Sequence, residues 1–189
     1  IGTGVPPWWD AAAYCFAHSE SPGADLPEMG ARSWQTERQR DLILAEWSEH
    51  LKRLPHERRE AALAALPQRL GVETPSGAFD GLMLSWDEVR AMREDRIDFG
   101  AHTVNHSILT TVDPERARTE ITRSKAAVEA ELGDPVTAFA YPNGGHSDIN
   151  PQIRAMVAEA GYRVAVTLVP GPARPAEVRR DPLMIRRVM

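Results

Sequence analysis

Apolar residues recur at helical spacing in the first part of the chain. Residues 34–54 carry one such stripe, and Pro55 ends it because proline cannot continue a helix. Residues 56–70 are rich in alanine and leucine, and Gly71 follows them as a helix stop. We therefore predict mostly helical structure up to residue 80. The stripe of the first segment consists of Ile43, Trp47, Leu51 and Leu54.

From residue 82 onward, short apolar runs alternate with amphipathic segments. A Ser-x-x-Glu capping box at Ser85 starts one helix, and an Asx-Pro pair starts two more, at Asp113 and Asn150. Regular alternation of strands and helices predicts a mostly parallel sheet or barrel. The predicted strands are residues 97–101, 136–141, 162–169 and 185–188, and residues 171–180 are predicted as a connector.

Composition narrows the class of protein. The 189 residues, 42% hydrophobic and 26% charged, are typical of one globular domain. A net charge of −5 gives no support for a nucleic-acid partner, and no apolar run approaches the roughly 20 residues of a membrane span. The single Cys15 excludes an intrachain disulfide. Because the chain begins at Ile1 without methionine or a signal-like segment, we expect an upstream piece.

Two histidines, His102 and His106, follow the predicted strand 97–101. If residues 102–106 form a helical turn, both imidazoles project from one face and could hold one metal ion. Ligands gather at strand ends in α/β folds, which favours this interpretation. The alternative is that both side chains only cap the strand and bind loop backbone.

A second strand end carries the tight turn Tyr141-Pro142-Asn143-Gly144. Its glycine allows a ligand to approach the backbone closely. The backbone N–H of Asn143 or Gly144 could stabilise an oxyanion, whereas Pro142 has none to donate. The alternative is an ordinary Asn-Gly turn without chemistry.

Together the two strand ends resemble those of the polysaccharide deacetylases, metal-dependent carbohydrate esterases built on the nodulation chitooligosaccharide deacetylase domain. His102–His106 matches the family's His-[Ser/Thr]-x-x-His motif, and Phe139–Gly144 is similar to its Phe-Ala-Tyr-Pro-x-Gly motif. The resemblance covers residues 82–189, so residues 11–80 are expected to be a helical insertion in a single partial domain. Further matches are Trp8-Trp9-Asp10, Glu120–Lys125 and Ala160-Gly161-Tyr162.

The resemblance implies a distorted parallel (β/α) barrel, incomplete at its N-terminus, and a divalent metal, most simply zinc. Two histidines, here His102 and His106, and an aspartate would hold the ion. A second aspartate would act as base, and a backbone N–H of the turn would bind the oxyanion. The implied catalytic residues are Asn143, Tyr141 and Arg187, and the implied substrate-binding residues are Pro142, Gly144 and His146.

The chain departs from the family pattern at several positions. The family's first motif, which supplies the base and the third metal ligand, contains an Asp-Asp pair that this chain lacks. Ala140 stands where an arginine is common, and no histidine follows Arg187 near the C-terminus. We therefore expect the third ligand to lie upstream of this chain. Residues 1–189 alone are expected to be inactive and to bind metal weakly.

These features predict an enzyme that removes N-acetyl groups from an amino-sugar polysaccharide or oligosaccharide. The alternative is a non-catalytic deacetylase-like domain that binds glycan or protein; a third possibility is an unrelated α/β enzyme. The expected partner is a glycan, with no nucleic acid and no membrane span in this segment. A homodimer or an upstream segment would complete the fold. The resemblance implies a bacterial source, and location inside or outside the cytoplasm stays open.

Overall fold

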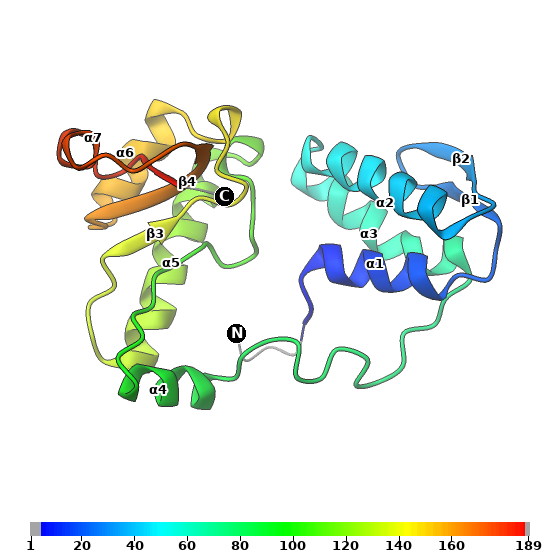
Figure 1. The fold of residues 1–189 in the computed structure, drawn as a ribbon, viewed down its shortest axis with the longest axis horizontal. Helices are drawn as coiled ribbons and strands as arrows, with labels where there is room; N and C mark the ends of the chain where they lie inside the picture. The colour runs from blue at the N-terminus through cyan, green and yellow to red at the C-terminus, as the bar shows by residue number, and fades with distance from the viewer. Residues whose placement is uncertain (1–4, 188–189) are drawn as a thin grey trace. The chain divides into compact units, whose positions relative to one another are not determined.

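A computed structural model describes residues 5–187. The chain divides into two compact units, Ile1–Ser85 and Trp86–Met189, which are described separately (Figure 1). Among the described residues, no helix combines the length and the apolar character that crossing a membrane requires. The boundary between the units lies close to residue 82, where the hydrophobic pattern of the sequence changes.

The first unit is mainly helical, as its apolar stripes predict. Thr36 caps the second helix by accepting a hydrogen bond from the Gln39 N–H at 3.2 Å, and Gly71 ends the third with a φ of 65°. A two-stranded antiparallel hairpin was not predicted, because its strands are short and have no run of apolar residues. The elements are α1 (Trp8–His18), β1 (Gly23–Leu26), β2 (Gly30–Ser33), α2 (Glu37–Lys52) and α3 (His56–Leu70).

Aromatic side chains fill the core of the first unit. Trp47 is fully buried on α2, and its indole N–H donates to the Pro27 carbonyl oxygen at 2.9 Å. Phe16 of α1 contacts both Trp47 and Trp34, with ring centroids 6.1 Å and 5.8 Å apart. The buried residues of this core thus all come from the first unit.

The second unit alternates strands with helices. The predicted caps are confirmed: Asp113 accepts from the Arg116 N–H at 2.9 Å, and Asn150 accepts from the Ile153 N–H at 2.8 Å. The helices are α4 (Trp86–Glu94), α5 (Pro114–Leu132), α6 (Pro151–Glu159) and α7 (Pro175–Arg180), with 3-10 turns η1 (Leu109–Thr111) and η2 (His146–Asp148). The strands are β3 (Ala138–Ala140), β4 (Val164–Pro170) and β5 (Ile185–Arg187).

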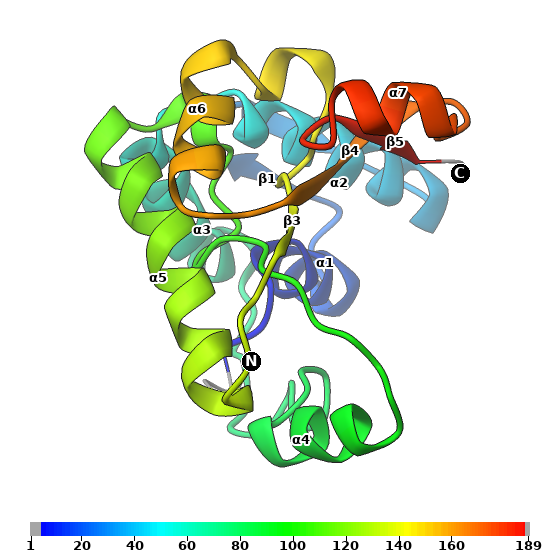
Figure 2. The ribbon, with the colours of Figure 1, turned by 90° about the vertical axis from the view of Figure 1, so that its left-hand side faces the viewer.

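The three strands form a parallel sheet in the order β3-β4-β5. Helices α5 and α6 run side by side next to this sheet (Figure 2). Phe139 of β3, Ala165 of β4, Ile121 of α5 and Val157 of α6 are all buried in one core. The mixed α/β class is confirmed, whereas a closed barrel is not seen: the described residues form only partial sheets.

Two local predictions near the histidines were wrong. Residues 97–101 do not form a buried strand: Ile97 is 43% exposed, and only Ala101 makes an isolated parallel bridge, to Phe139. Residues 102–106 do not form a helical turn, because Thr103 and His106 have φ values of 64° and 52°. An alternating apolar pattern alone does not make a strand where a continuous hydrogen-bonded ladder is missing.

The C-terminal predictions were nearly right. The connector 171–180 contains the short helix α7, which starts with Pro175 in the first helical position. The last predicted strand is present as β5, and Val188 lies outside the described residues.

Candidate metal centre

The histidine loop, residues 102–106, begins where the chain leaves the end of β3. The Ala101 N–H donates to Ala138 O at 3.0 Å, and the Ala140 N–H donates to Ala101 O at 2.9 Å. Gly100 permits this approach, since a Cβ there would lie 2.9 Å from Ala138 O. The loop is therefore anchored to one defined position on β3.

The two imidazoles of the loop lie against each other. The ring centroids of His102 and His106 are 4.6 Å apart, with an interplanar angle of 80°. His102 Nδ1 lies 2.7 Å from the carbonyl oxygen of Ala140. Because a carbonyl oxygen only accepts, Nδ1 carries the proton and donates it, which leaves the Nε2 lone pair for another ligand. A backbone carbonyl on the second ring nitrogen is the usual support of a metal-binding histidine.

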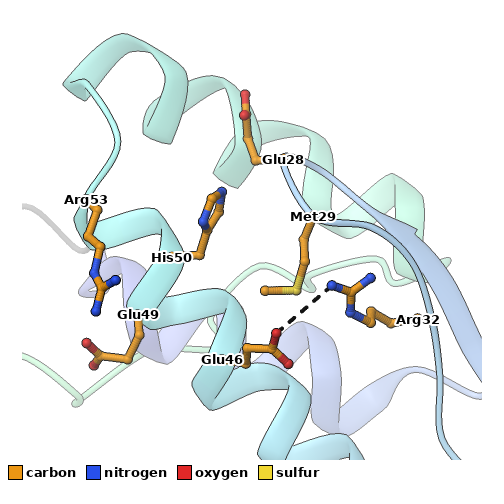
Figure 3. Close-up of a pocket in the computed structure, with 7 residues that line it drawn as sticks. All are labelled: Glu28, Met29, Arg32, Glu46, Glu49, His50 and Arg53. Carbon is orange, nitrogen blue, oxygen red and sulfur yellow. Dashed lines mark ion pairs between the residues drawn. The ribbon is translucent and has the colours of Figure 1, made fainter.

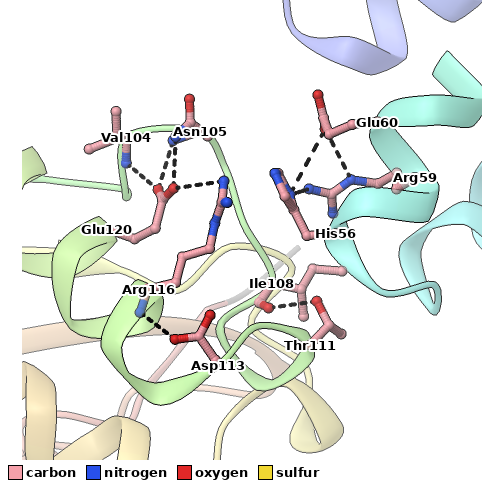
Figure 4. Close-up of polar contacts among 10 residues, drawn as sticks. All are labelled: His56, Arg59, Glu60, Val104, Asn105, Ile108, Thr111, Asp113, Arg116 and Glu120. Carbon is pink, nitrogen blue, oxygen red and sulfur yellow. Dashed lines mark hydrogen bonds and ion pairs between the residues drawn. The ribbon is translucent and has the colours of Figure 1, made fainter. Parts of the chain in front are cut away.

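The backbone of the histidine loop is held in an uncommon conformation. Left-handed φ values at Thr103 and His106 are costly, most of all for the β-branched threonine. One buried carboxylate, that of Glu120 on α5, binds the residues between them (Figure 4). The N–H groups of Val104 and Asn105 donate to Glu120 Oε2, both at 2.8 Å, and Asn105 Nδ2 donates to Oε1 at 2.7 Å.

The glycine turn, residues 142–145, follows β3 after the single residue Tyr141. Asn143 and Gly144 are both left-handed, with φ values of 57° and 62°. The Gly144 N–H donates to Pro142 O at 2.6 Å, and the Leu168 N–H donates to Gly144 O at 2.9 Å. Of the two candidate oxyanion donors, Gly144 is thus already engaged, and the Asn143 N–H has no hydrogen-bond partner among the described residues.

The remaining candidate residues occupy different surroundings. Tyr141 is buried, and its hydroxyl donates to Leu183 O at 3.1 Å. Burial raises the pKa of Tyr141 to about 12, with a smaller contribution from Asp181. Arg187 is exposed at the end of β5, and His146 is exposed in η2. The structure therefore gives Tyr141 core contacts and leaves Arg187 and His146 at the surface.

The segments that follow the histidine loop and the glycine turn also meet. The Thr110 hydroxyl of η1 donates to the carbonyl oxygen of Ser147 in η2 at 3.3 Å. The structure thus brings together His102, His106, the end of β3 and the start of the glycine turn.

The donor set of the histidine loop fits a borderline metal ion such as zinc, which accepts imidazole nitrogen. Two buried hydroxyls in the same segment, Thr103 Oγ1 and Ser107 Oγ, have no hydrogen-bond partner within the described part of the chain. Buried polar groups without a hydrogen-bond partner are uncommon in folded proteins. Within residues 5–187, no group of three histidine, cysteine, aspartate or glutamate side chains is placed to hold a metal. Asp98 is exposed and points to Arg93, 3.8 Å away.

Sequence reasoning missed the role of Glu120, although the sequence carries a signal for it. Ala117, Ile121 and Val128 form the apolar stripe of the helix, and Glu120 lies next to it. A carboxylate among core positions needs hydrogen-bond donors, which marks it for a specific contact. Its partners, 15 and 16 residues away, could not be identified from spacing.

A surface pocket in the first unit is a weaker candidate (Figure 3). Arg32 lies 4.0 Å from Glu46, and Glu28 is paired with Arg58. Charges of both signs neutralise each other there, as in an ordinary surface ion-pair network. The lining residues are Glu28, Met29, Arg32, Glu46, Glu49, His50 and Arg53.

Comparison with known families decides the class of protein. A sequence model of the family "Polysaccharide deacetylase" matches residues 47–165. The chain belongs to the polysaccharide deacetylase family. The match includes both the histidine loop and the glycine turn, and it begins within α2 of the first unit. The search of curated proteins found no match to the chain.

Solved structures of deacetylases are similar to part of the chain. The Streptococcus pyogenes deacetylase PplD, solved in complex with acetate, is 28% identical with a TM-score of 0.51, over 56% of this chain and 44% of that one. BC0361, a polysaccharide deacetylase from Bacillus cereus, is 26% identical with a TM-score of 0.46, over 56% and 32%. The deacetylase domain of BpsB from Bordetella bronchiseptica is 20% identical with a TM-score of 0.49, over 62% and 51%. This chain thus spans less than half the length of the first two.

Proposed function

We propose that this protein is a metal-dependent hydrolase that removes N-acetyl groups from an amino-sugar polysaccharide or oligosaccharide. The carrying observation is the histidine pair, whose ring centroids are 4.6 Å apart and whose His102 Nδ1 is bound to a strand-end carbonyl. Membership of the polysaccharide deacetylase family supports the class of reaction. The proposed metal is zinc, held by His102 and His106 and completed by a carboxylate, since a catalytic zinc site commonly takes three protein ligands.

The residues of the chain have distinct tasks in this proposal. Bound zinc would polarise the acetamide carbonyl and lower the pKa of a water ligand. His102 offers the lone pair of Nε2, because the Ala140 carbonyl keeps its ring in the required tautomer, and His106 is the proposed second ligand. The Asn143 N–H, which has no partner in the described structure, is the proposed donor to the oxyanion of the tetrahedral intermediate.

Acetate release tests this function. We expect the intact protein, loaded with zinc, to release acetate from N-acetylglucosamine oligomers, and a chelator to abolish the release until zinc is restored. His102→Ala and His106→Ala should each reduce the rate by at least about 100-fold, because each removes a ligand. His18→Ala is the matched control, since His18 is also exposed and also binds a backbone carbonyl through Nδ1, at 2.9 Å from Tyr14 O.

The control should keep the parent rate. Equal rates in the parent, His102→Ala and His106→Ala would contradict the proposal. Glycan binding without acetate release in the zinc-loaded protein would favour the alternative, a non-catalytic binding domain.

A further inference from the structure

Glu120 is a buried carboxylate with an unusual set of partners. It is 3% exposed, and its oxygens accept three hydrogen bonds, all from residues 104 and 105. Arg116, one turn earlier on α5, lies 3.9 Å from Oε1. Burying a carboxylate is costly unless donors surround it. Here the donors come from the histidine loop, so the contact orders that loop rather than α5.

The geometry of the loop shows what the carboxylate stabilises. The successive N–H groups of Val104 and Asn105 converge on one oxygen, as backbone N–H groups do in anion-binding nests. The strained residues Thr103 and His106 stand immediately before and after this pair. Without the carboxylate, two converging N–H dipoles would lose their common acceptor, and the loop would lose the contact that offsets its strain.

A second glutamate on the same helix provides the contrast. Glu129 also accepts a hydrogen bond from a backbone N–H, that of Val136, at 2.9 Å. It also pairs with Lys125, at 2.8 Å. The Val136 contact supports the segment before β3, the Lys125 contact lies within α5, and neither involves the histidine loop.

We propose that Glu120 is the positioning residue of the metal centre: its carboxylate fixes the histidine loop so that the two imidazoles share one ion. The proposal rests on the proposed function, because it takes His102 and His106 as metal ligands. Glu120 acts through the loop backbone and the Asn105 amide, without contacting the ion.

Zinc affinity tests the proposal independently of catalysis. We expect Glu120→Ala to weaken zinc binding to the intact protein by about 10- to 100-fold, the usual cost of losing the group that orients a ligand. Glu129→Ala, which removes a comparable contact elsewhere on α5, should change affinity by less than about threefold. The measurements are a competition titration with a zinc chelator and a urea unfolding curve for each variant.

A pair of substitutions that exchanges the hydrogen-bond donor and acceptor between Glu120 and Asn105 distinguishes loss of this contact from unfolding of the protein. Glu120→Gln keeps the shape of the side chain, and its oxygen still accepts both backbone N–H groups, but its amide then faces the Asn105 amide. Asn105→Asp restores an acceptor opposite that amide. We expect Glu120→Gln/Asn105→Asp to bind zinc more tightly than Asn105→Asp alone, in which two carboxylates face each other.

The outcomes separate the two proposals. Parent affinity in a folded Glu120→Ala protein, or a double variant no better than Asn105→Asp, would overturn the role of Glu120 while His102→Ala still abolishes binding. Parent affinity in His102→Ala and His106→Ala would instead overturn the metal site itself.

Discussion

The histidine loop and the glycine turn both leave the same end of the β3 region, yet they are stabilised differently. The histidine loop takes its shape from a side chain of another element, Glu120 of α5. The glycine turn is held mainly by backbone hydrogen bonds, one within the turn from the Gly144 N–H and one from the Leu168 N–H of β4, and by the nearby Asp148 carboxylate, which accepts from the Gly145 N–H. Both contain left-handed residues, but only the turn has a glycine among them.

The two loops differ in which residues determine their backbone conformation. A turn built from Asn and Gly carries its conformation in its own residues, because both tolerate a left-handed φ. A loop with left-handed Thr103 and His106 has no local reason for that shape, and a distant carboxylate supplies one. Substitutions should therefore affect the two loops through different contacts.

Gly144→Ala is the strongest way to break the glycine turn. A Cβ at this position would lie 2.9 Å from Leu168 N and 3.0 Å from Tyr141 O, at a φ of 62°. We expect a loss of about 3–4 kcal/mol in the free energy of unfolding, from backbone strain and the clash together. Urea denaturation measures it.

The matched control is Gly161→Ala, whose φ is 83° and whose Cβ would meet no atom within 4 Å. It should cost only the strain, about 1–2 kcal/mol. Equal losses in both variants would show that the close approach of the turn to β4 contributes nothing.

Alkaline pH tests the burial of two tyrosines, one next to the glycine turn and one in contact with α5, the helix that carries Glu120. Burial raises the pKa of Tyr141, which precedes the glycine turn, and of Tyr162, whose hydroxyl donates to Ile121 O on α5, to about 12. Between pH 10 and pH 12 the unfolded chain loses these protons while the folded chain keeps them, so stability falls as pH rises. The expected loss is up to about 2.7 kcal/mol per tyrosine.

Phenolate absorbance and unfolding curves measure this effect. Tyr141→Phe and Tyr162→Phe should each remove one part of the alkaline loss. Ionisation of either tyrosine near pH 10 in the folded protein would contradict the burial argument.

Glu129 is expected to give the smallest change in stability, and it differs from Glu120 because it does not contact the histidine loop. Its hydrogen bond with Lys125, and then that with the Val136 N–H, lower its pKa below the usual value of 4.5. Its contribution to stability is therefore present above that value and is lost as the pH falls through the lowered pKa. Glu129→Gln should flatten the acid limb of the stability curve slightly, without changing zinc affinity. An acid limb identical to that of the parent would remove the basis of this prediction.

Much of the fold was predictable because its signals are local. Asp113 and Asn150 cap helices with their own side chains, and Gly71 ends α3, so the sequence alone identifies these boundaries. The polysaccharide deacetylase family was also predictable, from two motifs in order. His102 lies beside the end of β3 through the bridge at Ala101, although the strand that was predicted to precede it is reduced to that bridge.

The rest depended on contacts that no local pattern reveals. The segment 97–101 has an apolar pattern but pairs only at Ala101, so its strand was overpredicted. The hairpin of β1 and β2 has few apolar residues and was missed. The role of Glu120 needs a contact between α5 and a loop, which spacing alone does not predict. The assignments of Asn143, Tyr141 and Arg187 to catalysis stay predictions.

The central claim is that His102 and His106 hold one divalent metal ion together. The most direct test is calorimetric titration of zinc into the intact protein and into His102→Ala, His106→Ala and the control His18→Ala. We predict one zinc site in the parent and in His18→Ala, and its loss in both variants of the histidine loop. Unchanged zinc affinity in His102→Ala and His106→Ala would contradict the account.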